Sequence, residues 1–144
     1  MILLVNTRIT TQALNRYPRA SWLPVYSRYD IFKYCLASRA VMSSLVDKFI
    51  FYIDLAEFTP RQQEMQDYME SIFPKDKLEI HWHRIDRTRT WREVCDATFT
   101  DPEQLVWYEG NDDHIFIDSN LDMIKAAQAT LKADLDPNAV MYYS

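Results

Sequence analysis

The chain has 144 residues, of which 48% are apolar and 14% aromatic, and its formal net charge is -5. This composition is typical of a globular domain and argues against disordered or fibrous proteins. The acidic balance argues against a general nucleic-acid-binding surface. The longest apolar runs, 1–5 and 49–53, are far shorter than the roughly 20 residues of a transmembrane helix. No secretory signal is recognisable, so we predict a cytoplasmic protein without a transmembrane segment.

The first half of the chain predicts two buried strands joined by a helix. Residues 2–5 form a continuous apolar run that stops at polar residues 6–8, as expected of a strand buried on both faces. Apolar residues at helical spacing predict the first long helix over 31–45. A second buried strand is expected over 49–53. Asp54 follows it immediately.

The middle of the chain carries clear start and stop signals. A capping box at Thr59, with proline at the first helical position, predicts a helix that Phe73-Pro74 ends. Apolar residues alternate with Glu and His over 78–82, which predicts a half-exposed strand at a sheet edge. A second capping box at Thr90 predicts a short helix, and a strand is expected over 105–108.

The C-terminal part completes the alternation of strands and helices. A weaker capping box at Ser119 predicts a helix, and an apolar run predicts a final strand over 139–143. Strands separated by helices predict an α/β fold with a mostly parallel sheet and flanking helices. No repeat or linker divides the chain, so residues 1–144 are expected to form one domain. Cys35 and Cys95 fall in predicted helices without metal or disulfide spacing, which indicates buried free thiols.

An acidic run after strand 105–108 is the main candidate for a functional motif. Gly110, the only glycine of the chain, is followed by Asn-Asp-Asp at 111–113. Adjacent carboxylates at the end of a buried strand repel one another and lose hydration, and a bound cation would stabilise them. The alternative is an Asn-Asp turn that caps the strand. A chain with one glycine cannot build the glycine-rich loops that hold phosphates, so a divalent cation bound by carboxylates is the expected substitute.

Polar residues follow three of the predicted strands, at 6–8, at Asp54 and at 111–113. In a parallel sheet the carboxyl ends of the strands meet at one edge, and ligands bind there near the point where the strand order reverses. We therefore expect the three polar segments to line a single crevice. A nucleotide is its predicted occupant.

The triplet at 111–113, the segment Ile115-Phe116-Ile117-Asp118 before a predicted helix, and the upstream Asp54 together resemble the nucleotide-binding half of GT-A glycosyltransferases. In that family a strand ends in a DxD-type motif that binds the metal of a nucleotide-sugar. The resemblance covers most of the chain. It implies a Rossmann-like GT-A core with the strand order three, two, one and then the DxD strand. It also implies that the acceptor-binding subdomain of the family is missing here.

The resemblance further implies a glycosyltransferase that uses Mn²⁺ or Mg²⁺ and a UDP-sugar donor, with UDP-glucose or UDP-galactose expected first. The acceptor and the catalytic base are not identified. Arg84 or Arg92 would contact the diphosphate or the sugar, although Arg84 could equally belong to a solvated edge with Arg87 and Arg89. The family's nucleotide contacts fall on Thr7, Arg8, Asp54 and Arg84, its sugar and diphosphate contacts on Arg92 and Asp112, and its metal ligands on Asp113, Asp112 and Asn111.

Three alternatives remain open at this point. Water could be the acceptor, which would make the protein a UDP-sugar hydrolase. The many Tyr, Trp and Met residues would also suit a non-enzymatic interaction domain that self-associates into a homo-oligomer through an exposed sheet edge. His81 and His83 share one face of a predicted strand and could bind a transition metal with His114, but solvent-facing histidines are the preferred interpretation.

Overall fold

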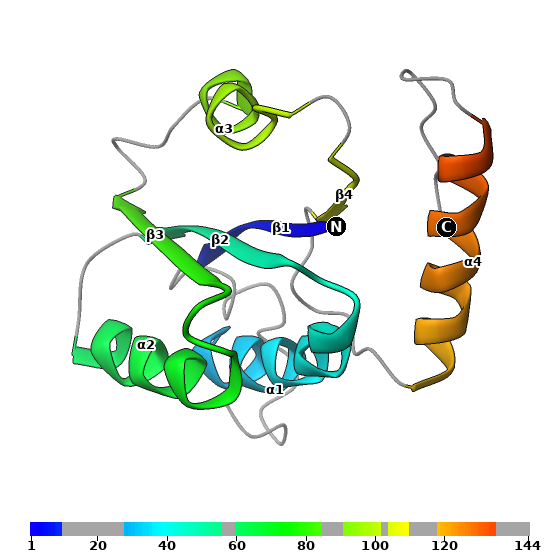
Figure 1. Cartoon of the computed structure of the whole chain (residues 1–144). Coiled ribbons are helices and arrows are strands. Elements are labelled where there is room, and N and C mark those ends of the chain that lie inside the picture. Colours follow the sequence, from blue (N-terminus) through cyan, green and yellow to red (C-terminus); the bar gives the residue numbers. More distant parts are fainter. Residues whose placement is uncertain (10–27, 56–59, 85–90, 102–103, 110–117, 135–144) are drawn as a thin grey trace, which may run out of the picture.

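The computed structural model describes residues 1–9, 28–55, 60–84, 91–101, 104–109 and 118–134. Its strands form one parallel sheet in the order β3-β2-β1-β4, flanked by helices (Figure 1). The predicted α/β class and strand order are thereby confirmed. The elements are β1 (Ile2–Ile9), α1 (Arg28–Arg39), the short 3-10 helix η2 (Ala40–Ser44), β2 (Lys48–Leu55), α2 (Pro60–Ile72), β3 (Leu78–Arg84), α3 (Trp91–Thr98), β4 (Val106–Glu109) and α4 (Asp118–Asp134).

Three strands, β1, β2 and β3, are longer than predicted, and the difference is largest for β1. β1 pairs with β2 without interruption from Ile2 opposite Lys48 to Ile9 opposite Leu55. Residues 6–8 therefore belong to the strand and not to a loop, and Asp54 lies inside β2 instead of beyond its end. The apolar run marks only the part of each strand that is covered on both faces. Backbone pairing continues past it, because a strand can carry polar side chains where one face is less covered.

Helices cover the two faces of the sheet unequally. α1 and α2 lie together on one side, here named the first face, and α3 lies alone on the other side, the second face (Figure 1). Alternate residues of each strand point to opposite faces. Thus Phe51 belongs to the large core cluster of the first face, whereas its neighbour Tyr52 packs with Val94 of α3 on the second face.

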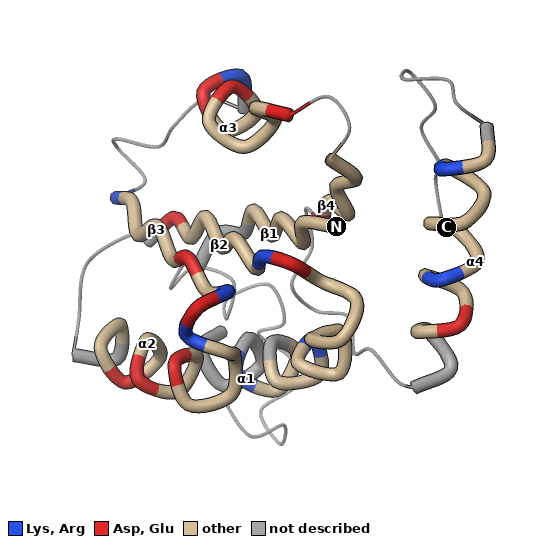
Figure 2. Tube along the Cα trace, viewed as in Figure 1, with Lys and Arg blue, Asp and Glu red and all other residues tan. Residues whose placement is uncertain are grey.

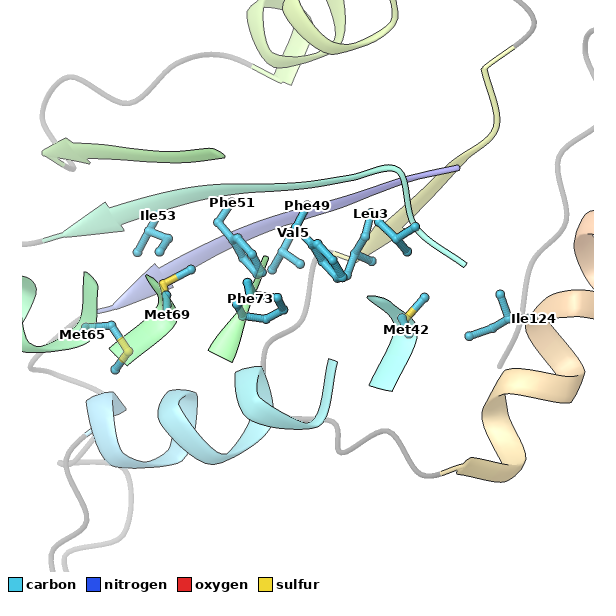
Figure 3. Packing of buried hydrophobic residues seen from close by; sticks show 11 residues of the cluster. Leu3, Val5, Met42, Phe49, Phe51, Ile53, Met65, Met69, Phe73 and Ile124 are labelled. Carbon is cyan, nitrogen blue, oxygen red and sulfur yellow. The ribbon is translucent and has the colours of Figure 1, made fainter. Parts of the chain in front are cut away.

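The first face holds the main core of the protein. Figure 3 shows its aromatic and aliphatic side chains between the strands and the helices beneath them. Phe73 contacts both Phe49 and Phe51, with ring centroids 4.8 and 5.3 Å apart. Ile124 of α4 is also fully buried in this cluster. The buried members are Leu3, Val5, Met42, Val46, Phe49, Phe51, Ile53, Met65, Met69, Phe73 and Ile124.

Other elements follow their sequence signals closely. α2 begins at Pro60 and ends before Phe73-Pro74, and β3 is an edge strand whose residues are mostly half-buried, as predicted. The prediction of one long helix over 31–45 was wrong in one respect: α1 ends at Arg39, and the chain continues as the short 3-10 helix η2. The predicted final strand, 139–143, lies outside the described residues. Over the described ranges, no helix combines the length and apolar character needed to cross a bilayer.

The charged residues are distributed unevenly between the helices and the sheet. Figure 2 shows the acidic and basic residues mainly on the helices and on the connection between α2 and β3, whereas most of β1 and β2 is uncharged. A central strand is flanked by other strands and covered by helices, so a charge on it would lose its hydration. The few charged residues inside the sheet therefore need a specific explanation, and they lead to the candidate site.

Candidate functional site

The order of the strands reverses beside β1. The chain passes from β1 to β2 and β3 through helices on the first face, then returns through α3 on the second face to place β4 on the other side of β1 (Figure 1). Consecutive crossovers on opposite faces leave a crevice at the carboxyl ends of the two strands between them. The candidate site is therefore the carboxyl edge of β1 and β4.

A side-chain hydrogen bond spans these two strands on the second face. The Asn6 side chain shares it with the phenol of Tyr108, which lies in β4 opposite Leu4. Tyr108 is 47% exposed, but its partial burial raises the pKa of the phenol, and the hydrogen bond to Asn6 opposes this effect only in part. The phenol therefore stays neutral at physiological pH and can both donate and accept a proton in hydrogen bonds.

A buried ion pair fixes the end of β4 from the first face. The Nε atom of Arg39 donates to Oε2 of Glu109 over 2.6 Å, and the two side chains are 0% and 9% exposed. The Nη1 atom of Arg39 also donates to the carbonyl oxygen of Cys35, at 2.6 Å. Buried charges of this kind are found paired, because neither could lose its hydration alone. Glu109 is the last described residue before the acidic run 110–113.

Neither partner of this ion pair was predicted. A signal for Arg39 exists in the sequence: it stands four residues after Cys35 and three before Met42, which are both buried. This spacing places the arginine on the inward stripe of a helix, where an unpaired charge is not tolerated. No comparable signal marks Glu109 as its partner, because the two residues are 70 positions apart.

The second face becomes polar toward the carboxyl edge. Asp54 is only 6% exposed, and in the ladder it lies between Arg8 of β1 and His83 of β3. Thr7 pairs with Ile53, one position earlier. The structure thus brings the backbone positions of Thr7, Arg8 and Asp54 together on adjacent strands, as the convergence of strand ends predicted. The burial of Asp54 is a feature that its expected loop position did not predict.

The two histidines of β3 are half-buried and stacked, with 29% of the His81 side chain exposed, so the solvent-facing interpretation is only partly right. Tyr52 stacks on His81 with ring centroids 4.5 Å apart and planes within 8°, and His81 and His83 are parallel within 3°. The Nε2 atom of His81 is 2.5 Å from Oε1 of Glu79. Register explains this row, because Tyr52 lies opposite His81 in the parallel ladder.

Glu79 links this row to the start of β2. Its carboxylate forms an ion pair with Lys48 and lies within hydrogen-bond distance of Nε2 of His81. Burial acts to raise the pKa of Glu79, but the hydrogen bonds from Lys48 and His81 outweigh it, and the pKa lies below its usual value. Glu79 is therefore ionised at neutral pH and balances the positive charge of Lys48.

The two predicted arginines are less closely connected to the candidate site. Arg84 is the last residue of β3, lies opposite Leu55 and is exposed. Arg92 is on the surface of α3, with its side chain 90% exposed and its Nε atom 3.8 Å from Asp96. The predicted metal ligands Asn111, Asp112 and Asp113 lie outside the described residues, as do His114, Arg87 and Arg89.

Neither a metal cluster nor a reactive thiol is found in the described part of the chain. No three His, Cys, Asp or Glu side chains gather there in a group that could hold a metal ion. Both cysteines carry reduced thiols: Cys35 is buried and Cys95 is partly buried. Burial raises the pKa of the Cys95 thiol, which disfavours the nucleophilic thiolate. Comparison of the chain with protein families, curated proteins and solved structures finds no match.

Proposed function

We propose that the protein binds a UDP-sugar together with Mn²⁺ or Mg²⁺ at the carboxyl edge of β1 and β4 and transfers the sugar to an acceptor. The observation that supports this most directly is the reversal of strand order at β1. β4 is the strand beside that reversal, and its last residue, Glu109, directly precedes the acidic run 110–113. Asn111, Asp112 and Asp113 therefore follow the strand beside the reversal of strand order, where ligands bind in parallel sheets, and they supply oxygen donors for a cation.

The donor set suits a hard divalent cation. Asn111, Asp112 and Asp113 offer amide and carboxylate oxygens, which Mg²⁺ and Mn²⁺ prefer over nitrogen or sulfur. When bound, the cation would neutralise negative charge on the departing diphosphate. Arg39 and Glu109 are positioning residues in this proposal, since their ion pair holds the point from which the acidic run begins.

The nucleoside would lie over the ends of β1 and β2. Thr7 and Arg8 are proposed to contact the base and ribose, and Asp54 to accept a hydrogen bond from N3-H of uracil. Arg84, one register position beyond Asp54 and His83, is proposed to contact the diphosphate, because it lies at the carboxyl end of β3. Arg92, exposed and beside Asp96, is the weaker candidate. No described residue is assigned as catalytic base, so the acceptor remains open.

Titration calorimetry tests the proposal with UDP-glucose and UDP-galactose, each with and without Mn²⁺. We expect binding that depends on the metal and that weakens at least about tenfold, or 1.4 kcal/mol, in Asp113→Ala. Asp122→Ala is the matched control, because Asp122 lies on α4 with its side chain 88% exposed. Metal-independent binding, or equal affinities for the wild type and Asp113→Ala, would refute the cation site.

Product analysis distinguishes transfer from hydrolysis. The wild type is incubated with UDP-sugar and metal, with water as the sole acceptor, and free sugar is measured. Rapid release of free sugar identifies a hydrolase. A donor that binds but is not cleaved until a sugar or peptide acceptor is added identifies a transferase. No binding under any of these conditions would overturn both assignments.

A further inference from the structure

The outer edge of β3 presents an ordered row of backbone groups. The Phe49 amide donates to the Lys77 carbonyl at 2.8 Å, so Lys77 and every second residue after it direct their backbone groups toward β2. The intervening residues, Leu78, Ile80, Trp82 and Arg84, direct theirs outward. No other described strand pairs with this edge, since β3 ends the sheet in the order β3-β2-β1-β4.

The same edge is incompletely covered on the first face. Leu78, Ile80 and Trp82 point toward the main core, yet all three remain partly exposed, unlike Phe49, Phe51 and Ile53 of the neighbouring β2. A shallow hollow adjoins them between β3 and α2. Its lining consists of Gln66, Glu70, Lys75, Leu78 and Ile80. An added strand would cover these apolar side chains and place its own side chains over the hollow.

We propose that two copies of this chain associate through β3, antiparallel, with His81 of each copy opposite His81 of the other. This register pairs all residues from Leu78 to Arg84, and it is self-complementary about a two-fold axis. The outward residues then meet outward residues: Ile80 lies opposite Trp82 of the second copy and exchanges two backbone hydrogen bonds with it. Helices α1 and α2 of both copies lie on the same side of the continuous sheet.

Side-chain chemistry selects a second copy as the partner. In this register Glu79 lies opposite His83 of the second copy in a non-hydrogen-bonded pair, where side chains approach most closely. On the other face, Ile80 and Trp82 form a β-branched and aromatic pair, which stabilises antiparallel strands. A charge on an edge strand ordinarily blocks pairing. In this register the Glu79 carboxylate faces the imidazole of His83 and not an apolar side chain, so its charge does not block the pairing.

The dimer contacts share only Arg84, the last residue of β3, with the proposed nucleotide site. β3 is the edge strand farthest from β4, with β2 and β1 between them. Dimerisation therefore leaves the carboxyl edge between β1 and β4 open. A failure of nucleotide binding would not affect it, and a monomeric protein could still bind a nucleotide.

Sedimentation velocity over a range of protein concentrations tests the association. We expect a reversible dimer for the wild type and for Ile80→Val, which keeps the backbone donor. Ile80→Pro removes one outward N-H that pairs with none of the described strands, so it should remain folded by circular dichroism and become monomeric. A wild type that stays monomeric at the highest concentration reached would overturn the proposal, as would an Ile80→Pro protein that is folded and still dimeric.

Disulfide trapping tests the register without relying on proline. In a background carrying Cys35→Ala and Cys95→Ala, His81→Cys should cross-link to itself on mild oxidation, because the Cα atoms of such a pair are about 4.5 Å apart. Glu79→Cys and His83→Cys should not form homodimers alone but should cross-link when mixed. Efficient self-linking of Glu79→Cys, or no link in the mixture, would overturn this arrangement.

Discussion

The two faces of the sheet are built from the same strands but serve different purposes. Leu3 and Leu4 are adjacent in β1 and both are fully buried, yet Leu3 lies in the large cluster under α1 and α2, and Leu4 lies in a small cluster under α3. The first face is apolar over most of its length, apart from the buried ion pair between Arg39 and Glu109 at the end of β4. The second becomes polar toward the carboxyl edge, where Asn6, Asp54 and His83 replace aliphatic residues. The first face supplies most of the hydrophobic core, and the second face carries polar side chains near the candidate site.

The largest expected effect is a loss of stability when a buried leucine is shortened, and it differs between the two faces. Leu3→Ala should reduce the free energy of unfolding by about 4 kcal/mol, because the cavity opens in a rigid, densely packed cluster. Leu4→Ala should cost less, about 2.5 kcal/mol, because the thinner layer under α3 can collapse around the missing atoms. Urea denaturation of both variants measures the difference. A loss for Leu4→Ala equal to that for Leu3→Ala would show that the two layers pack equally well.

The next effect concerns the ion pair that ties α1 to the end of β4. Arg39→Met should destabilise the protein by about 3 kcal/mol, because it leaves the Glu109 carboxylate buried without its partner. The double variant Arg39→Met with Glu109→Met should recover most of this loss, since both charges are then gone. Urea denaturation of the single and double variants measures both values. A double variant no more stable than Arg39→Met would contradict the assigned coupling.

The smallest effect concerns Glu79, near the start of β3 on the second face, and the pH dependence of stability measures it. The pKa of Glu79 is lowered on folding from its ordinary 4.5, so its contribution to stability is present above pH 4.5 and is lost as the pH falls through the folded pKa. Because the group is partly solvated, Glu79→Gln should cost less than about 1 kcal/mol at pH 7. The difference from wild type should shrink as the pH falls below 4.5.

Two controls separate this effect from others. Lys48→Met should remove much of the same pH dependence, since Lys48 is an ion-pair partner of Glu79. The measurements are made at protein concentrations low enough to exclude association through β3. An energy difference between wild type and Glu79→Gln that persists unchanged to pH 3 would show that the carboxylate has no stabilising partner in solution.

Local signals in the sequence predicted most of the fold. The capping box with Pro60 located the start of α2, and the alternation over 78–82 identified an edge strand. Strand ends were predicted less well, because Asn6 and Asp54 look like loop residues when read alone. They belong to the ladder because the neighbouring strand continues beside them, and backbone pairing does not depend on which side chain a residue carries.

The candidate site, too, could be predicted from the sequence only in part. That polar positions at the ends of β1 and β2 lie side by side was predictable, because parallel strands end at a common edge. That Tyr52 stacks on His81 was not predictable, because it requires the register of β2 on β3. The contact between Arg39 and Glu109 was also not predictable, since it joins a helix to the last strand described on the sheet.

The sequence by itself determined the order of helices and strands, the class of the fold and the side chains available at the carboxyl edge. These follow from periodicity, caps and composition, which act over a few neighbouring residues. Only the tertiary structure decided which face of the sheet is thickly covered, which charges are buried together and which edge is left open. Those outcomes depend on contacts between residues far apart in the chain, whose energies no local pattern contains.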